Sequence, residues 1–311
     1  MAAAAELTDD QAWHAFRRKG VGASDIGALL GLSKWSSPMS LWCEKLGLLP
    51  PSEETQRQRI GKRMETVLAA EFQDETGLTL AGEQTWLTSL DWSIARCTID
   101  GAVVPPPAPG TDPNLSDFLG PWEAKTSAMR GWDEIPPTYL AQIQWQMYVM
   151  GAPRAWLTVM FAGFQIETYT VERDDADIAF MVERAKEFWH LVETETMPEV
   201  DGSDATTDAL SHLYPRHIEG RTVDLSGMAA KVAHLLDLKD EAKRIKDETK
   251  ELNNEIRAAI GDAEIAEING YPAFTFRQQP GQKRTCSACS HIDQGEPFRV
   301  LRQIKRKGAT K

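Results

Sequence analysis

A carboxylate and an ammonium group stand two residues apart, at Glu123 and Lys125, at the end of a short apolar run. In a β-strand, residues i and i+2 point to the same face, so these two side chains project together while Ala124 points the other way. Taken alone, such a pair is typical of an ordinary ion pair on a sheet face.

The chemistry becomes more specific when Asp100 is added. This carboxylate ends the preceding strand-like run and is followed by Gly101, a place from which a strand aims a side chain outward. Two carboxylates and a lysine on adjacent strands make a site for a hard cation such as Mg²⁺, with Mn²⁺ able to substitute. The lysine can hold or deprotonate a water molecule, and the metal offsets charge on attacking and leaving oxygens. The pattern favours hydrolysis of a phosphodiester.

The elements around these residues predict a mixed α/β sheet flanked by helices. An amphipathic helix over residues 56–77 carries Glu65 beside its apolar stripe, and Gly77 stops it. A proline-rich loop, 105–121, separates a strand ending at Asp100 from the strand at 122–126. A helix over 139–150, two strands at 155–161 and 164–171, and a helix over 176–194 follow.

The N-terminal segment predicts two short helices, the second beginning at Ser24 as its N-cap. The glycines from Gly20 to Gly27 do not have the spacing of a dinucleotide-binding loop, and no strand precedes them. Most of the ten tryptophans, Trp42, Trp145 and Trp189 among them, sit within apolar patterns and are expected in the core.

The C-terminal third has a different pattern. Apolar side chains recur by three and four between Leu235 and Ala259, which predicts a helix that packs on its own domain, forms a helical hairpin or makes a coiled-coil contact. Asn269-Gly270 predicts a hairpin turn, and a third strand is expected at 298–302. From Arg277 onward there are nine basic and two acidic side chains, which gives this segment a net charge of +7. Because the whole chain has a net charge of −12, the residues before Arg277 sum to −19. We expect this basic unit to touch a nucleic-acid backbone or to serve solubility.

Composition narrows the class of protein. The chain has 311 residues, no apolar run long enough for a membrane span and only four scattered cysteines, so we expect a soluble protein of the reducing cytoplasm, in a bacterial or phage-infected cell. Cys286-x-x-Cys289-x-His291 resembles half of a zinc site, but a second pair of ligands is missing.

Asp100-Gly101 followed by Glu123-x-Lys125 resembles the PD-(D/E)XK nuclease pattern, although Ile99 stands where the pattern has proline. Five segments in order, over roughly residues 10–195, resemble the lambda-exonuclease-like (YqaJ-type) branch of that superfamily. Besides the nuclease pattern these are Trp13-His-Ala-Phe-Arg17 leading to Gly-Ala-Ser24-Asp25, Ser37-Pro-Met-Ser-Leu-Trp-Cys-Glu-Lys45, Gly61-Lys-Arg-Met-Glu65, and Tyr139-Leu-Ala-Gln142-Ile-Gln-Trp-Gln-Met-Tyr148-Val-Met-Gly151.

The resemblance implies a restriction-endonuclease-like core over residues 1–200. Beyond the resemblance, the sequence pattern predicts a linker at 201–224, a long charged helix at 225–261 and a basic β unit at 262–311. It implies that the metal ligands are Asp100, Glu123 and Glu65. Lys125 then takes the water-activating place and Gln142 supports the metal site from the following helix. Arg17 and Ser24 fall in the segment that grips a 5′-terminal phosphate in relatives.

The function implied by the resemblance is magnesium-dependent 5′ to 3′ digestion of one strand of linear double-stranded DNA in phage-type recombination. A ring-shaped homo-oligomer, for which a trimer is one arrangement, and a single-strand annealing protein as partner are implied with it. Two other functions stay open. One is a structure-specific or Cas4-like nuclease on the same metal core, although the four cysteines are badly placed for the iron–sulfur cluster of a Cas4-like protein. The other is a non-catalytic DNA-binding protein.

Overall fold

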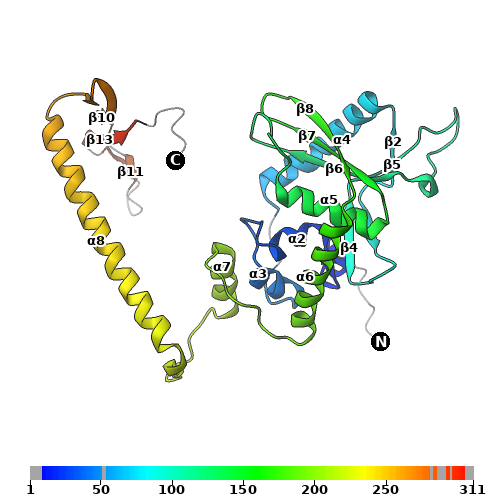
Figure 1. Cartoon of the computed structure of the whole chain (residues 1–311), viewed down its shortest axis with the longest axis horizontal. Helices are drawn as coiled ribbons and strands as arrows, with labels where there is room; N and C mark the ends of the chain where they lie inside the picture. Colours follow the sequence, from blue (N-terminus) through cyan, green and yellow to red (C-terminus); the bar gives the residue numbers. More distant parts are fainter. Residues whose placement is uncertain (1–8, 51–53, 281–282, 286–291, 295, 305–311) are drawn as a thin grey trace. The chain divides into compact units, whose positions relative to one another are not determined.

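The computed structural model describes residues 9–50, 54–280, 283–285, 292–294 and 296–304. The chain divides into two compact units, Met1–Ile218 and Glu219–Lys311 (Figure 1). The division falls close to the start of the long helix expected from residue 225. Each unit is described by itself.

A five-stranded mixed sheet organises the N-terminal unit. Its strand order is β2-β5-β6-β7-β8, with β2 at Thr79–Ala81, β5 at Gly101–Val104, β6 at Gly120–Thr126, β7 at Arg154–Met160 and β8 at Ile166–Glu172. The β6–β7 pair is parallel and is joined by helix α5, Pro137–Met150, whereas the other neighbours pair antiparallel. A parallel pair needs such a crossover. The mixed α/β sheet predicted from the sequence is confirmed.

A second, three-stranded sheet has the order β1-β4-β3, with β1 at Val21–Gly22, β3 at Thr85–Thr88 and β4 at Ala95–Ile99. The sequence predicted a strand that ends at Asp100, and β4 does end at Ile99, directly before it. After Asp100 the chain continues into β5 of the other sheet, a strand that the sequence analysis did not predict. Asp100 therefore lies at the point where the chain passes from one sheet to the next.

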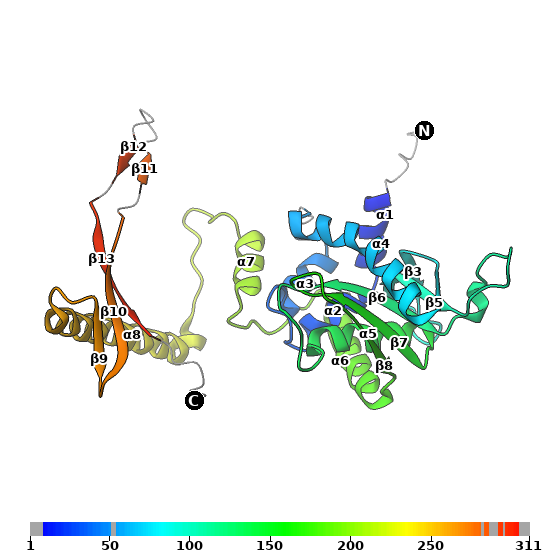
Figure 2. The same cartoon turned by 90° about the horizontal axis from the view of Figure 1, so that it is seen from above.

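Helices cover both faces of the five-stranded sheet (Figures 1 and 2). Helix α4, Gln56–Thr76, packs Leu68 and Phe72 on the face that carries Trp122, Ala124 and Trp156. Helix α5 packs on the opposite face, where the buried side chains of β7 are Leu157 and Val159. Because Leu157 is the register partner of Glu123, the Glu123 side chain lies on the α5 face.

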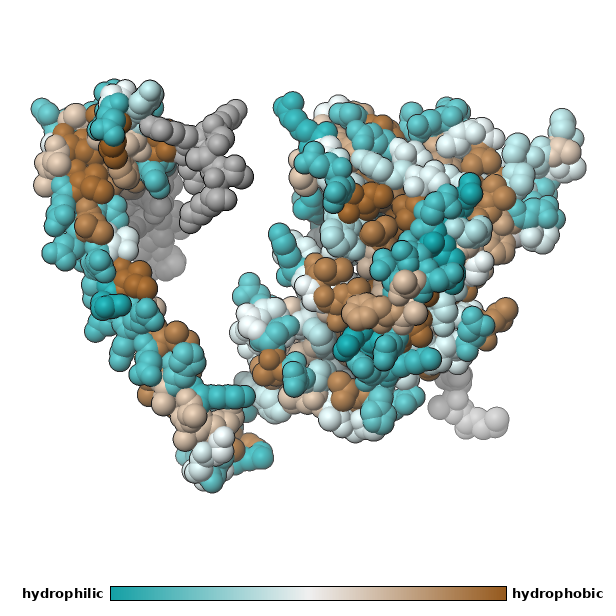
Figure 3. Space-filling model, in the orientation of Figure 1, coloured by the Kyte–Doolittle hydropathy of each residue, from teal (hydrophilic) through white to brown (hydrophobic). Residues whose placement is uncertain are grey.

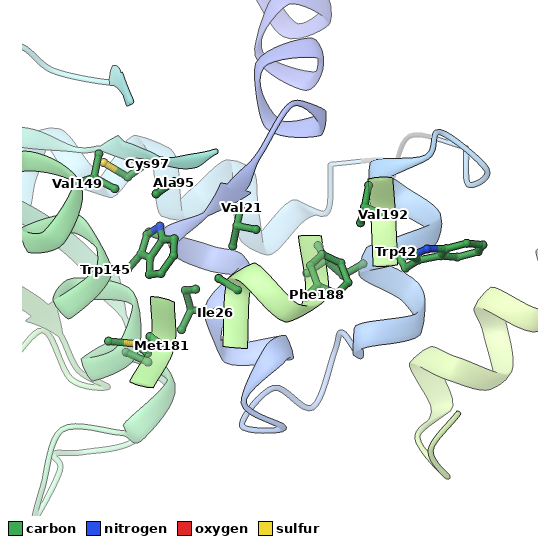
Figure 4. Packing of buried hydrophobic residues seen from close by; sticks show 14 of the residues in the cluster. Val21, Ile26, Trp42, Ala95, Cys97, Trp145, Val149, Met181, Phe188 and Val192 are labelled. Carbon is green, nitrogen blue, oxygen red and sulfur yellow. The ribbon is translucent and has the colours of Figure 1, made fainter. Parts of the chain in front are cut away.

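Short helices close the rest of this unit around a third apolar cluster, shown in Figure 4 with Val21, Ile26, Trp145 and Met181. The helices are α1, Asp9–Arg18, α2, Ala23–Leu29, α3, Pro38–Lys45, and α6, Asp175–Glu193. Trp42 and Trp145 are buried in this cluster and Trp189 packs against it, as predicted.

Two local predictions were wrong. Helix α2 begins after Gly22, not at Ser24, because the Asp25 carboxylate accepts the Gly22 N–H at 2.8 Å and so caps the first turn. The expected linker at 201–224 contains helix α7, Asp204–Leu213, which buries Ala209 and whose Thr206 hydroxyl donates to Ser37 of the α3 N-cap. Burial of this face makes α7 part of the N-terminal unit.

The C-terminal unit begins with a 3₁₀ turn, Ser226–Met228, and the single helix α8, Ala229–Ile260. The hairpin alternative for this region is wrong, since 229–260 is one uninterrupted helix. A small sheet follows, in which β10, Tyr271–Gln279, lies between β9, Ile265–Ile268, and β13, Phe298–Gln303. Strands β11, Lys283–Thr285, and β12, Ile292–Gln294, pair separately.

The small sheet contains the predicted hairpin. Asn269 and Gly270 have φ of 55° and 79°, the left-handed geometry that a two-residue turn between twisted strands requires. Arg299 of β13 lies over the Phe276 ring and donates to the backbone oxygens of Gly261 and Ala263, which ties the sheet to the end of α8. The half zinc site, Cys286, Cys289 and His291, lies outside the described residues.

Among the helices that the structure describes, none combines the length and apolar character needed to cross a bilayer.

Glycine substitutions test the sheet directly. A Cβ on Gly120 at the start of β6 would lie 1.9 Å from the Arg154 carbonyl oxygen of β7, whereas Gly61 within α4 has open space around it. We expect Gly120→Ala to destabilise the chain by about 1–3 kcal/mol or more and Gly61→Ala to stabilise it by about 0.5–1 kcal/mol. Urea unfolding measures both; equal effects would contradict the close approach of β6 and β7.

Candidate active site

The centre of the candidate site is the Glu123 carboxylate on β6. Glu123 is only 4% exposed, and its Oε1 accepts a hydrogen bond from Lys125 Nζ. The alternation of β6 places both side chains on one face while Ala124 packs under α4, as the sequence predicted for their directions, and α5 covers the face that carries the pair. A buried carboxylate needs hydrogen-bond donors to offset the loss of water.

Helix α5 supplies two more donors. Gln142 Nε2 donates to Glu123 Oε1 at 2.6 Å, and Gln146 Nε2 donates to Glu123 Oε2 at 2.6 Å. Both carboxylate oxygens are thereby held in place. The sequence analysis identified Gln142 but missed Gln146, although its spacing of four places it on the same helix face. Gln146 Oε1 is buried without a hydrogen-bond partner among the described residues.

The second carboxylate, Asp100, faces the first across the β5–β6 edge. Its Oδ2 accepts the Ala124 backbone N–H at 2.9 Å, and its Oδ1 accepts Gln84 Nε2 at 3.2 Å. The same Gln84 nitrogen donates to Glu65 Oε2 of α4 at 3.0 Å. The Gln84 amide therefore joins the carboxylates of Glu65 and Asp100. The predicted residues Glu65, Asp100 and Glu123 thus come together in one site.

Gln84 was also missed, because no helix or strand periodicity marks the loop between β2 and β3. Its φ of 52° is left-handed, an unusual conformation for a residue other than glycine. Such a conformation costs free energy and persists where the surrounding contacts fix it, here the two carboxylates that accept its amide.

The electrostatics of the site show an excess of negative charge. Burial, reinforced by Glu123, raises the pKa of Asp100 to about 7. Burial and then Glu123 also raise the pKa of Glu65. For Lys125, burial lowers the pKa, but Glu123 and Asp100 outweigh it, so the pKa lies above the ordinary value and the group is an ammonium ion. One ammonium does not balance three carboxylates.

This donor set fits a divalent hard cation. All the charged ligands are carboxylate oxygens, and a cation would relieve the repulsion that raises the pKa of Asp100 and Glu65. Within the described residues, no group of three or more His, Cys, Asp or Glu side chains is arranged so that it could hold a metal ion by itself. A cation such as Mg²⁺ needs only one or two carboxylates, because water or phosphate oxygens supply the other ligands.

The second predicted pair, Arg17 and Ser24, is also brought together. Arg17 Nη1 donates to Ser24 Oγ at 2.8 Å. The guanidinium also binds Asp25 at 2.8 Å and Glu44 at 3.3 Å, so internal carboxylates offset its charge. Glu44 is the more exposed of these two carboxylates.

Asp25 organises this second cluster. Burial alone would raise its pKa, but Lys45 and Arg17 together hold the pKa below its usual value. Lys45 Nζ lies 2.5 Å from Asp25 Oδ2, and its side chain is fully buried. The cluster is thus a buried ion pair that positions the Arg17 guanidinium beside Ser24.

The pKa of Asp100 predicts how stability varies with pH. In the presence of a chelator, the folded chain holds the Asp100 proton up to about pH 7, while the unfolded chain releases it near its ordinary value of 3.8. The carboxyl therefore lowers the free energy of unfolding as pH rises between these values. We expect Asp100→Asn to be more stable than the wild type at pH 8 and equally stable near pH 4 in urea unfolding.

The matched measurement adds Mg²⁺ at pH 8. The cation should stabilise the wild type more than Asp100→Asn, because binding to the folded state alone raises the free energy of unfolding. A wild type that gains no stability from Mg²⁺ or Mn²⁺ would contradict the cation site.

The Asp25 cluster predicts a large effect on stability. Asp25→Ala leaves the Lys45 ammonium buried without its partner, which we expect to cost about 3–5 kcal/mol. Glu44→Ala removes an exposed partner of Arg17 and should cost no more than about 1 kcal/mol. Urea unfolding compares them; equal costs would mean that Lys45 finds water in the variant.

Residues 12–153 match the family described as YqaJ-like viral recombinase domain. The curated Bacillus subtilis (strain 168) protein named "Uncharacterized protein YqaJ" is 29% identical over 274 residues, which is 86% of this chain and 83% of that protein.

Two solved structures were also matched. The alkaline exonuclease LHK-Exo from Laribacter hongkongensis is 22% identical, with a TM-score of 0.46 over 60% of this chain and 93% of that chain. A phage-related exonuclease from Haemophilus somnus 129PT is 13% identical, with a TM-score of 0.41 over 57% of this chain and 96% of that chain.

The family match includes every residue of both clusters described above, from Arg17 to Gln146. Residues 12–153 of this chain are therefore similar to the YqaJ-like viral recombinase domain family.

Proposed function

We propose that this chain is a metal-dependent deoxyribonuclease that degrades one strand of linear double-stranded DNA from its 5′ end, in phage-type recombination. The observation that carries the proposal is the group of Glu65, Asp100 and Glu123 around a lysine, inside a YqaJ-like domain. A protein that only binds DNA has no use for three partly buried carboxylates, which repel the phosphate backbone.

A divalent cation, Mg²⁺ or Mn²⁺, held by oxygens of Glu65, Asp100 and Glu123 would supply Lewis-acid stabilisation of the charge on the phosphate. Gln84 donates to two of these carboxylates, so the cation competes with this amide. Gln142 and Gln146 fix the Glu123 carboxylate, and thereby the direction in which its oxygens face.

In this reaction, Lys125 acts on the attacking water molecule or on the phosphate of the DNA. With its pKa above the ordinary value, it is positively charged and can orient a water molecule or attract a phosphodiester oxygen. It can accept a proton only after a cation has offset the neighbouring carboxylates, because these are what hold the proton on it.

The direction of digestion depends on how a DNA end is held. Arg17 and Ser24 lie 2.8 Å apart and offer a guanidinium and an exposed hydroxyl to a 5′ phosphate. A homo-oligomer that encircles the duplex and a single-strand annealing protein as partner belong to the same proposal. An enzyme of recombination would act in the cytoplasm of the bacterial or phage-infected cell.

The test compares linear duplex DNA with and without a 5′ phosphate and covalently closed circular DNA, each with MgCl₂ or EDTA. We expect release of nucleotides from 5′-phosphorylated linear ends alone, only with Mg²⁺. Lys125→Ala should lower the rate by about a hundredfold or more, since it removes a charge that acts on the reacting phosphate.

Lys186→Ala, an exposed lysine on α6, is the matched control and should leave the rate unchanged. Unfolding curves confirm that both variants are folded. Cleavage of the closed circle would make the protein an endonuclease on the same site. Absence of cleavage with every substrate would favour the DNA-binding alternative.

A further inference from the structure

Helix α8 carries an apolar seam that its own unit leaves uncovered. Leu235, Leu238, Ile245 and Leu252 are between 49% and 52% exposed, and only toward the helix end, at Ile256, is the seam half-buried. In Figure 3, hydrophobic atoms appear at intervals between hydrophilic ones along this helix. A helix that presents leucines at regular spacing to water is expected to bury them against a partner.

The spacing of the seam fits a coiled coil. The side chains alternate by three and four over about three and a half heptads, the repeat that keeps one stripe facing a partner helix. In heptad lettering the a positions are Leu235, Ala242, Thr249 and Ile256, and the d positions are Leu238, Ile245, Leu252 and Ala259.

The charges of α8 fit a second copy of the same helix as the occupant. The helix has seven basic and seven acidic side chains, so its net charge is zero with the histidine neutral. Basic side chains recur at spacings of four and three along one side of the seam, at Lys239, Lys243, Lys246 and Lys250, while glutamates lie on the other side. A second copy therefore meets no net repulsion and offers opposite charges beside the seam.

The residues that flank the seam set the orientation. The g positions are Glu241, Glu248 and Glu255, and the e positions are Lys239, Lys246 and Asn253. In a parallel pair, each g residue faces the e residue of the next heptad of the partner, so Glu241 of each copy meets Lys246 of the other. An antiparallel pair places glutamate opposite glutamate and lysine opposite lysine.

We propose that α8 associates in parallel with α8 of another copy of this chain. The pairing buries the seam and forms two symmetry-related Glu241–Lys246 ion pairs. Ala242 and Thr249 at seam positions bury little apolar area, so the association is moderate in strength and depends on protein concentration. Because β9 begins a few residues after α8 ends, parallel pairing brings the two small C-terminal sheets to the same end of the coiled coil.

The test is sedimentation equilibrium of the full chain over a range of concentrations, with a pair of matched variants. Leu238→Asp places a charge in the seam, whereas Leu236→Asp makes the same change two residues away, at an equally exposed position outside it. We expect Leu238→Asp to weaken self-association by about tenfold or more and Leu236→Asp to leave it within about twofold of the wild type. Circular dichroism confirms equal helix content.

The orientation is tested with charges. Glu241→Lys should weaken self-association several-fold, and adding Lys246→Glu should restore it, because the ion pair returns with reversed sign. An antiparallel pair predicts no such rescue. A wild type that stays monomeric at all concentrations overturns the proposal. Self-association that both leucine variants leave unchanged also overturns it. A failed rescue by Lys246→Glu overturns the parallel arrangement.

Discussion

The candidate site depends on the hydrogen bonds that hold the buried Glu123 carboxylate. This carboxylate is held on the α5 face of the sheet by one ammonium and two amide donors, and both of its oxygens are engaged. Those donors fix the position of α5, the crossover that joins the parallel strands β6 and β7. A carboxylate without such donors would take up a proton or reach for water, and either change would disturb the packing of α5 on the sheet.

The same arrangement explains why the carboxylates of the site repel one another. Asp100 lies where the chain leaves one sheet for another, and its carboxylate accepts the Ala124 N–H of β6. Its place is therefore set by the backbone of both sheets and cannot adjust to lower the repulsion from Glu123. The raised pKa of Asp100 expresses this constraint. A site that costs stability in this way is typical of function, because packing alone would favour apolar groups there.

Arg17 shows how tertiary contacts change the net charge that a sequence motif presents. The sequence presents an arginine and a serine suited to an anion, and the structure does bring them together. It also places Asp25 and Glu44 on the same guanidinium, with Lys45 buried beneath. The cluster is nearly neutral, so the Arg17 guanidinium offers hydrogen-bond geometry at this point more than net charge.

The amino-acid pattern was enough to predict the mixed α/β class, the strand that carries Glu123 and Lys125, the carboxylate of Asp100, the long helix and the Asn269-Gly270 hairpin. These follow from period and turn chemistry, which are local properties, whereas Glu65 and Gln142 were chosen from the resemblance to a nuclease family. The folded structure was needed to show that Gln146 donates to the Glu123 carboxylate, that Gln84 bridges Glu65 and Asp100, and that α7 belongs to the N-terminal unit. Those contacts join residues distant in the chain, and their free energy comes from burial and charge that exist only once the sheet and helices have packed.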